Sequence, residues 1–214
     1  VTGTNGKSTT VQFIGRILEH AGHRVGWTTT ASFKVAEREW VNDQKMTMLG
    51  RFQTQRLLRQ MVNVGCRYAV IETSSQGITQ SRHIGINYDV AVFTNLTPEH
   101  IEAHGGFEKY KAAKLRLFEG LGKLRHKVIE GEEIQKGIIV NLSDPHAEAF
   151  LACQADKHYG FATTKTPPNL PLVRGGVFAT DVHFTGSCTT FSVGDSTYHL
   201  KPIGRFYLEI VLAA

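Results

Sequence analysis

A glycine-rich stretch near the start of the chain, Thr2-Gly-Thr-Asn-Gly-Lys-Ser-Thr-Thr10, contains the residue types that bind phosphate groups. Glycines let backbone N–H groups converge on an anion, and a helix that follows such a loop points the positive end of its dipole at the same place. Lys7 can reach terminal phosphates, and the Ser8 hydroxyl can ligate Mg²⁺. The general pattern has a glycine where Val1 stands, so the stretch predicts a variant phosphate-binding loop.

A carboxylate, Glu72, follows directly after the apolar run 68–71. Such a run is typical of a strand that is buried on both faces of a parallel sheet. Glu72 would then lie at the carboxyl edge of the sheet, where ligands bind in folds of this kind. Because Mg²⁺ prefers oxygen ligands, we expect Ser8 and Glu72 to hold a magnesium ion. The alternative for Glu72 is a surface carboxylate at a strand end.

Two histidines, His100 and His104, lie four residues apart. This spacing occurs in zinc sites, but the metalloprotease motif requires a glutamate directly after the first histidine, and Ile101 stands there. Thr97 and Pro98 predict the N-terminus of a short helix over this stretch. A capping or surface role is the alternative to metal binding for His100, and nothing marks His104 beyond its helical spacing.

Lys114 lies inside the apolar stripe of a helix that the spacing of apolar residues predicts over 107–121. A lysine in such a position usually extends its ammonium group to water. Burial of the amine would instead lower its pKa and favour the neutral, nucleophilic form. The residue pattern leaves both arrangements open.

The predicted elements alternate between strands and helices along most of the chain. In order, they are a helix over 11–21, an extended segment over 25–41, a helix over 52–62, strands over 68–71 and 89–93, the helix over 107–121 and a strand over 137–140. This order predicts an α/β fold of the P-loop type, with a doubly wound, mostly parallel sheet. Short Thr/Val/Phe stretches within 177–200, broken at glycines, predict a small antiparallel sheet toward the C-terminus.

Composition narrows the function further. The 214 residues include 24 Lys+Arg and 19 Asp+Glu, for a formal net charge of +5, but the basic residues are dispersed and no nucleic-acid-binding signature accompanies them. No apolar run approaches the roughly 18 residues that a membrane-spanning helix needs. The chain has three widely spaced cysteines and opens without a signal peptide, so we expect a cytoplasmic protein with no nucleic-acid or membrane partner. The sequence leaves its oligomeric state open.

Four ordered motifs resemble those of one enzyme family. Gly3-Thr-Asn-Gly-Lys-Ser8 resembles the ATP loop of the Mur ligases and their folylpolyglutamate synthetase relatives, which join an amino acid to a carboxylate through an acyl phosphate. Glu72-Thr-Ser-Ser-Gln-Gly77 resembles the second motif of the family. Thr94-Asn-Leu-Thr-Pro-Glu-His100 resembles the third, with Glu99 where aspartate is usual. Tyr110-Lys-Ala-Ala-Lys114 resembles the fourth.

The resemblance implies a set of ATP and metal ligands. It implies that ATP is bound by Gly3, Thr4, Asn5, Gly6, Lys7, Ser8, Thr9 and Asn95. It implies two Mg²⁺ sites, with ligands from Ser8, Glu72, His100 and Lys114. In the family, the lysine of the fourth motif reacts with CO₂ to give a carbamate that helps hold the second Mg²⁺, which we expect at Lys114. The residues expected to be catalytic are Lys7, Glu72, His100 and Lys114.

The stretch 74–82 is most similar to the Mur ligases of the MurE type, which add the third residue to UDP-N-acetylmuramoyl-L-alanyl-D-glutamate. The resemblance implies that Ser74, Gln80 and Arg82 bind this UDP-MurNAc-peptide, and that an amino acid is the second substrate. By spacing, Thr47 stands where these enzymes have another substrate-binding threonine. Met48 follows it, where a second threonine is common.

The next motif of the family departs from the pattern in this chain. Gly204-Arg-Phe206 matches, but Tyr207 and Ile210 stand where the family has two asparagines that lead into a nucleotide-binding helix. The resemblance covers 1–214 as the central ATP-binding domain, without the uridine-binding and amino-acid-binding domains that flank it in the family. We therefore expect that this chain alone does not complete a ligation. Another Mur ligase, a folylpolyglutamate synthetase-like enzyme and a nucleotide-binding module without ligase activity are the alternatives.

Overall fold

The computed structural model of the protein describes residues 1–99, 102–163, 175–185, 187–201 and 204–214. Its helices are α1 (Lys7–His20), α2 (Arg51–Asn63), α3 (Ser75–Thr79), α4 (Phe107–Leu121), α5 (Ala147–Leu151) and α6 (Arg205–Leu212), with a 3-10 helix at Glu102–His104. Its strands are β1 (Val25–Thr28), β2 (Ser32–Val35), β3 (Arg38–Val41), β4 (Tyr68–Ile71), β5 (Val90–Phe93), β6 (Lys127–Ile129), β7 (Glu132–Ile134), β8 (Gly137–Asn141), β9 (Lys157–Ala162), β10 (Gly175–Phe178), β11 (Thr180–Phe184), β12 (Thr189–Val193) and β13 (Ser196–Leu200).

The central sheet consists of two four-stranded parts, in the orders β3-β2-β1-β4 and β10-β9-β8-β5. Val1 and Thr2 join the two parts because they lie between β4 and β5. The Val1 nitrogen donates to the Ile71 carbonyl at 2.9 Å, and the Thr2 N–H donates to the Val92 carbonyl at 2.9 Å. β1 and β4 are parallel, as are β5, β8, β9 and β10, whereas β2 and β3 are antiparallel. The prediction of a mostly parallel sheet is confirmed.

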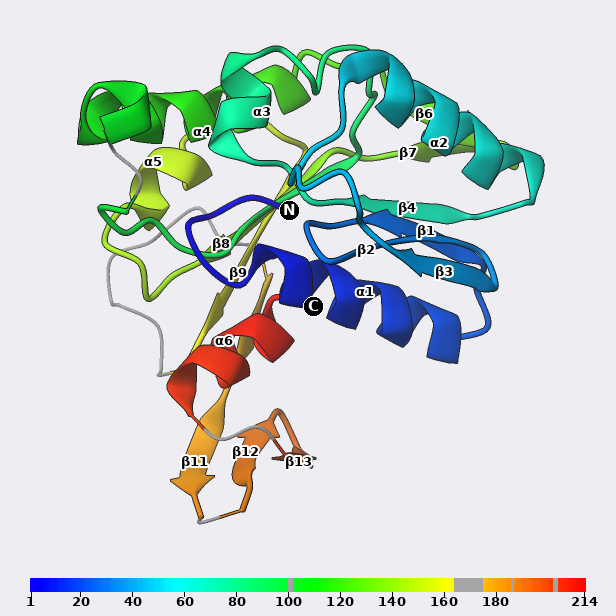
Figure 1. Ribbon diagram of the computed structural model, residues 1–214. Helices are drawn as coiled ribbons and strands as arrows, with labels where there is room; N and C mark the ends of the chain where they lie inside the picture. The colour runs from blue at the N-terminus through cyan, green and yellow to red at the C-terminus, as the bar shows by residue number, and fades with distance from the viewer. Residues whose placement is uncertain (100–101, 164–174, 186, 202–203) are drawn as a thin grey trace.

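Helices cover both faces of this sheet, as a doubly wound fold requires (Figure 1). On one face, Phe118 of α4 and Phe150 of α5 pack against Phe93 of β5, with Phe93 and Phe150 stacked at 3.8 Å between ring centroids. On the other face, α1 and α6 share a core with Trp27 of β1. The predicted antiparallel sheet is also present, in the order β11-β12-β13, and it projects from the body beside α6 (Figure 1).

Two local predictions are wrong. β4 is not buried on both faces: Tyr68 is 38% exposed, and Ile71 alone is fully buried. The reason is that Val1 pairs only with Ile71 and Thr73 at the carboxyl end of β4, and no described strand pairs with its amino end on that side. The helix predicted to begin at Thr97 and Pro98 does not begin there. Residues 97–99 are not helical, and the 3-10 helix that follows is Glu102–His104.

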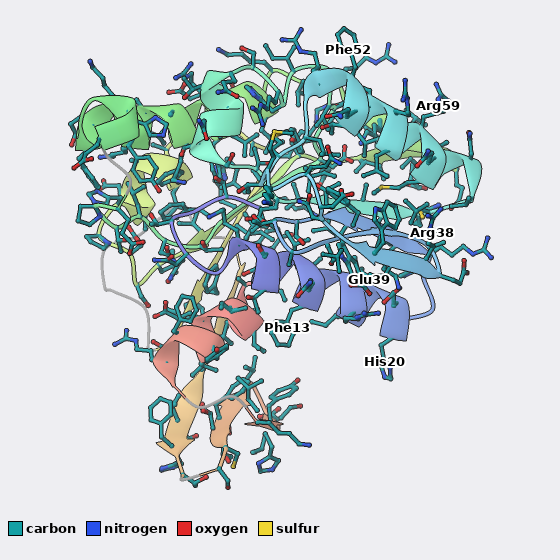
Figure 2. All side chains as sticks on the ribbon, in the orientation of Figure 1. Phe13, His20, Arg38, Glu39, Phe52 and Arg59 are labelled. Atoms are coloured by element: carbon teal, nitrogen blue, oxygen red, sulfur yellow. The ribbon has the colours of Figure 1, made fainter. Side chains whose placement is uncertain are left out.

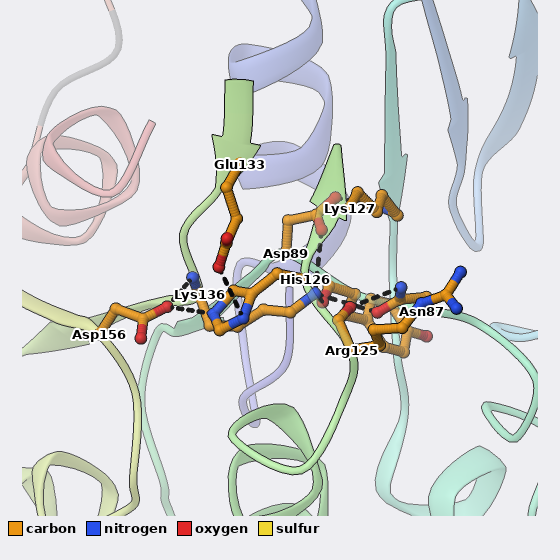
Figure 3. A network of polar contacts seen from close by, with 9 residues as sticks. Asn87, Asp89, Arg125, His126, Lys127, Glu133, Lys136 and Asp156 are labelled. Atoms are coloured by element: carbon orange, nitrogen blue, oxygen red, sulfur yellow. Dashed lines mark hydrogen bonds and ion pairs between the residues drawn. The ribbon is translucent and has the colours of Figure 1, made fainter. Parts of the chain in front are cut away.

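The amino edge of the sheet, where β5, β8 and β9 begin, carries a network of charged side chains (Figure 3). Lys136 is 2% exposed, and its Nζ donates to Asn87 Oδ1, the Tyr88 carbonyl and Asp89 Oδ1 at 2.6 to 3.0 Å. Lys127, the first residue of the β6–β7 hairpin, pairs with the other oxygen of Asp89. This network therefore anchors the hairpin to the start of the sheet.

A second branch of the same network centres on His126. Its Nε2 lies 2.7 Å from the Asp156 carboxylate, and its Nδ1 lies 3.2 Å from that of Glu133. The Lys136 N–H donates to Asp156 as well, at 2.6 Å.

Among the described residues, no helix has the length and apolar character that crossing a membrane requires.

Candidate nucleotide and metal site

The loop between Thr2 and α1 lies at the carboxyl edge of the sheet, opposite the network of Lys136. Two glycines shape it. A side chain at Gly3 would collide with the Thr94 hydroxyl, and Gly6 has φ +79°, a left-handed conformation that L residues rarely adopt. Lys7 and Ser8 therefore open α1 directly after the turn, so the N-terminus of a 14-residue helix faces the loop.

Ser8 and Glu72 are brought together as predicted. The Ser8 hydroxyl donates to Glu72 Oε2 at 2.6 Å, although the two residues are 64 apart in the sequence. Glu72 is 2% exposed, and its carboxylate also accepts from the Thr30 N–H at 2.7 Å and the Thr30 hydroxyl at 3.1 Å. This set of a carboxylate and hydroxyls at the mouth of the loop fits the oxygen ligands that Mg²⁺ prefers. No cluster of three or more His, Cys, Asp or Glu side chains competes with it in the described ranges.

Sequence reasoning missed Thr30. The available signal was the Thr28-Thr-Thr30 run inside the predicted extended segment 25–41, a run that in the structure begins at the last residue of β1. β1 pairs in parallel with β4, the strand that leads to Glu72. The carboxyl ends of neighbouring parallel strands meet at one edge, so a polar residue there is a candidate partner.

Lys7 is folded back onto its own loop. Its Nζ donates to the Thr4 carbonyl at 2.8 Å. Burial lowers the pKa of Lys7 below its usual range, and the Glu72 carboxylate partly opposes this shift. A phosphate group would therefore exchange one neutral acceptor of Lys7 for a charged one.

Lys114 is buried, which decides between the two arrangements that the sequence left open. It is 1% exposed, and its Nζ donates to the Gly3 carbonyl at 2.7 Å and lies 4.5 Å from the centroid of the Tyr110 ring. Burial, followed by the positive charge of Lys7, lowers the pKa of Lys114 to about 7. No carboxylate pairs with it in the described part of the chain. At a pH near this pKa a large share of the Lys114 amine is neutral, and the neutral amine is the nucleophilic form.

Asn95 holds the loop from the neighbouring strand end. Its Oδ1 accepts from the Asn5 N–H at 2.8 Å, and its Nδ2 donates to the Asn5 carbonyl at 3.1 Å. Glu99, which replaces the usual aspartate, accepts from the Asn5 side chain at 3.0 Å. Thr9 follows Ser8 in the first turn of α1. His100 lies outside the described residues, and its predicted role stays a prediction.

The four residues predicted to bind the acceptor lie on neighbouring segments. Ser74 caps α3 by accepting from the Gly77 N–H at 3.0 Å. Arg82, beyond α3, donates to the Met48 carbonyl at 2.6 Å, next to Thr47. Gln80 is exposed at the end of α3. The structure thus brings Arg82 next to Thr47, and the role of the four residues in binding the acceptor stays a prediction.

A cleft of about 730 Å³ opens next to the loop. Its lining residues include Asn95, Pro98, Asn141, His146, Arg205 and Glu209. The two departures from the family motif lie on α6 but outside this lining. Ile210 is 3% exposed and packs against Gly6, whereas Tyr207 is 40% exposed.

The family described as the Mur ligase middle domain matches residues 1–214. The chain belongs to this family. Among its relatives, a UDP-N-acetylmuramoyl-L-alanyl-D-glutamate–2,6-diaminopimelate ligase of Geobacillus thermodenitrificans is 38% identical over 226 residues, which cover 100% of this chain and 42% of that protein. A UDP-N-acetylmuramyl-tripeptide synthetase of Roseiflexus sp. is 40% identical over 153 residues, or 71% of this chain and 30% of that protein.

The fold of this Mur ligase middle domain agrees with solved structures. A structure of a UDP-N-acetylmuramoyl-L-alanyl-D-glutamate–2,6-diaminopimelate ligase superposes with a TM-score of 0.77 at 24% identity, covering 99% of this chain and 40% of that one. The predicted family and fold class are therefore confirmed. The chain spans less than half the length of these relatives.

Proposed function

We propose that this Mur ligase middle domain is the ATP-binding part of an amide-bond-forming ligase that adds an amino acid to a UDP-MurNAc-peptide. The observation that carries the proposal is the contact between Ser8 and Glu72, 2.6 Å apart at the mouth of the glycine loop, with the buried amine of Lys114 behind it. The names of the relatives supply the substrate class. Uridine binding and amino-acid binding are assigned to domains that flank residues 1–214 in the family.

ATP would lie with its phosphates on the loop and its nucleoside in the neighbouring cleft. Backbone N–H groups between Gly3 and Ser8 surround the phosphates, and Lys7 turns from the Thr4 carbonyl to a terminal phosphate. Ser8 and Glu72 would hold Mg²⁺, which neutralises the phosphate charge during transfer. Because Ile210 fills the space over Gly6, the polar groups for the nucleoside must come from the cleft, where Asn141 and Arg205 provide them.

The proposed reaction has two steps. A carboxylate oxygen of the acceptor forms a bond to the γ-phosphorus as the bond from that phosphorus to the bridging oxygen breaks, which gives an acyl phosphate and ADP. The amine of the incoming amino acid then forms a bond to the acyl carbon, loses a proton and displaces phosphate. Lys7 is positioned to stabilise the charge of both transition states. Arg82 and Gln80 would orient the acceptor.

Lys114 would carry the CO₂-derived carbamate and, with His100, serve a second Mg²⁺ site. Its low pKa supports this proposal, because the neutral amine is the form that adds to CO₂ with loss of a proton. The product is a carboxylate-like anion at a place where the described residues offer none. A ¹³C NMR spectrum recorded in ¹³C-bicarbonate should contain a carbamate resonance that disappears in Lys114→Met. A spectrum without that resonance would contradict the carbamate.

The function is tested by ATP and Mg²⁺ binding. At a hundredfold excess over Kd, ligand stabilises the folded state by about 2.7 kcal/mol, which a thermal melt detects readily. We expect this stabilisation for the unsubstituted chain and its loss in Lys7→Ala and Glu72→Gln. The exposed Lys123→Ala and Glu132→Gln serve as matched controls that retain it. If ATP and Mg²⁺ produce no stabilisation, the proposal is wrong.

A second candidate is a nucleotide-binding module without ligase activity. Ile210 and Tyr207 favour it, because neither supplies the amide that the family has at these positions. The complete gene product, given ATP, an amino acid and UDP-N-acetylmuramoyl-L-alanyl-D-glutamate, separates the two candidates by whether ADP is formed. A panel of acceptors that includes folates tests the other ligase classes. We propose a cytoplasmic location, which the wide spacing of the three cysteines in the sequence favours.

A further inference from the structure

A carboxylate on α6 lines the cleft beside the glycine loop. Glu209 accepts from the Asn141 side chain at 3.2 Å and from Arg205 Nε at 3.3 Å, and its side chain is 20% exposed. The other carboxylate of the lining, Asp144, accepts from two backbone N–H groups at 2.7 and 2.8 Å. Glu209 is thus held by side chains at longer distances, and a carboxylate has about four acceptor positions, so it can accept from a ligand as well.

Asn141 fixes the position of this carboxylate. It is the last residue of β8 and is 2% exposed. Its amide donates to the Thr94 carbonyl at 2.9 Å and accepts from the Ser143 N–H at 2.9 Å, which orients the second N–H toward Glu209. Both N–H groups of Asn141 are then in use, so Asn141 acts on a ligand in the cleft through Glu209.

Glu209 and Arg205 place an acceptor next to a donor. Only the Nε of Arg205 contacts Glu209, and the terminal nitrogens of this guanidinium, which is 60% exposed, have no partner among the described residues. Adenine carries the complementary pair on one edge, because its 6-amino group donates and its N7 accepts. Guanine has two acceptors there, O6 and N7, so its O6 would face the Glu209 carboxylate without a hydrogen between them.

Apolar side chains supply the rest of the surface that a base needs. The cleft is also lined by Leu96, Pro98, Phe107 and Pro145. A base has apolar faces and carries its hydrogen-bonding groups on its edges. A mostly apolar lining with a few placed polar groups is typical of small-molecule sites.

We propose that Glu209 is the residue that selects adenine in this chain: its carboxylate accepts from the 6-amino group, Arg205 donates to N7, and Asn141 positions the carboxylate. The inference rests on the proposed function, which places the nucleoside in this cleft. It gives the chain a polar reader of the base although Tyr207 and Ile210 replace the two asparagines of the family motif. Glu209 stands between these two replacements on α6.

The test varies the base and the protein together. Titration calorimetry of the complete gene product with Mg²⁺ gives Kd for ATP, for GTP and for purine riboside triphosphate, which lacks the 6-amino group. We expect ATP to bind the unsubstituted protein about tenfold more tightly than purine riboside triphosphate, the effect of one charge-assisted hydrogen bond, and to bind more tightly still than GTP. In Glu209→Ala the first ratio should fall to about one.

Glu209→Gln sharpens the comparison, because its amide can present an N–H to O6. The preference for ATP over GTP should fall about tenfold in this variant. Each ratio is measured on one variant, so a change in the folded fraction cancels. Glu39→Gln is the matched control: Glu39 also pairs with an arginine and accepts from a neutral side chain, but it lies beside α1 and β3, away from α6 (Figure 2). It should leave every ratio unchanged.

Asn141→Ala tests the positioning role. We expect it to lower the preference for ATP over purine riboside triphosphate as Glu209→Ala does, with no further change when the two substitutions are combined. A purely structural role of Asn141 would weaken all three nucleotides alike and leave the ratio intact, which would contradict the positioning.

Failure of this inference differs from failure of the proposed function. If ATP binds but the unsubstituted protein does not distinguish it from purine riboside triphosphate, or if Glu209→Ala keeps the ratio, Glu209 does not read the base and ATP binding stands. If none of the three nucleotides binds, the inference and the proposed function are both wrong.

Discussion

Two buried lysines lie at opposite edges of the same sheet, and their surroundings differ sharply. Lys136, at the amino edge, is 2% exposed and donates to three acceptors, one of which is the Asp89 carboxylate. Lys114, at the carboxyl edge, is 1% exposed and donates to the Gly3 carbonyl, with no carboxylate partner in the described ranges. The two side chains are about equally buried, so they differ in whether a carboxylate pairs with the ammonium group.

The difference indicates a structural role for Lys136 and a chemical role for Lys114. A buried ammonium with a carboxylate and two further acceptors is satisfied, and removing it leaves partners stranded. A buried ammonium with one neutral acceptor is poorly compensated, which is why the pKa of Lys114 falls to about 7. Groups perturbed in this way, close to a glycine-rich loop at the start of a helix, are typical of functional sites.

The largest expected effect is loss of activity in Lys114→Met. Methionine is similar in length and does not add to CO₂, so we expect ligation by the complete gene product to fall about 100-fold to 1,000-fold, the scale of losing one electrostatic contact at a reacting centre. The free energy of unfolding at pH 7 should rise, because the substitution removes an ammonium whose pKa folding lowers from 10.5 to about 7, an effect larger than the about 1 kcal/mol of the one hydrogen bond that is lost. Turnover measures the effect on activity and urea denaturation measures the effect on stability, with the exposed Lys109→Met as control. A fully active Lys114→Met protein would contradict the proposed role.

The second effect is loss of stability in Lys136→Met. Removing this buried ammonium breaks its ion pair with the partly exposed Asp89, which keeps Lys127, and removes the hydrogen-bond donor of the Tyr88 carbonyl and the Asn87 amide oxygen. We expect the free energy of unfolding to fall by about 3 kcal/mol in urea denaturation, while the folded fraction binds ATP as before. Lys127→Met is the matched control, since Lys127 pairs with the same carboxylate but is 38% exposed; its loss should be below about 1 kcal/mol. If both substitutions lower the free energy of unfolding equally, burial of Lys136 does not make its pair with Asp89 more important than that of the exposed Lys127.

How far the sequence predicted these features depends on how local each one is. The helix over 107–121 was predicted with its observed bounds because a long apolar stripe and flanking glycines define it. The three-residue strands β6 and β7 and the five-residue helix α5 are too short to show a period, so they were missed. β9 was missed as well.

The same reasoning holds for the candidate site. Ser8 and Glu72 each end or begin a predictable element, so their meeting could be predicted from topology. The burial of the Lys114 amine could not be predicted, because the group that it contacts, the Gly3 carbonyl, lies 111 residues away in the sequence. Lys136 carried no local signal at all, since its partner Asp89 lies 47 residues earlier.

A third prediction uses pH to isolate Lys114. Its pKa is about 7 in the folded state against 10.5 in the unfolded chain, so the unfolded state binds more protons between these values. Stability should therefore rise with pH across this window, by about 1.4 kcal/mol per pH unit from this group. The difference in unfolding free energy between the unsubstituted chain and Lys114→Met, measured in CO₂-free buffer at pH 7, 8 and 9, reports that slope alone. If the unfolding free energies of the two proteins change in parallel with pH, the pKa of the Lys114 amine is not lowered in the folded state.

The smallest effect is expected at the rim of the amino-edge network, in Asp156→Asn. The Lys136 N–H and, second, the His126 side chain hold the pKa of Asp156 below its usual range. A carboxylate with a lowered pKa contributes stability above its unfolded pKa and loses it as pH falls through the folded value, so the difference from Asp156→Asn should be present at pH 7 and vanish in acid. Because both partners are about one-third exposed, the effect should be about 0.5 kcal/mol, or a shift in Tm of one or two degrees. The exposed Asp195→Asn, in the β12–β13 turn, is the control. An effect on ATP affinity in Asp156→Asn would mean that the two edges of the sheet are coupled, which the separation of Lys136 from Lys114 argues against.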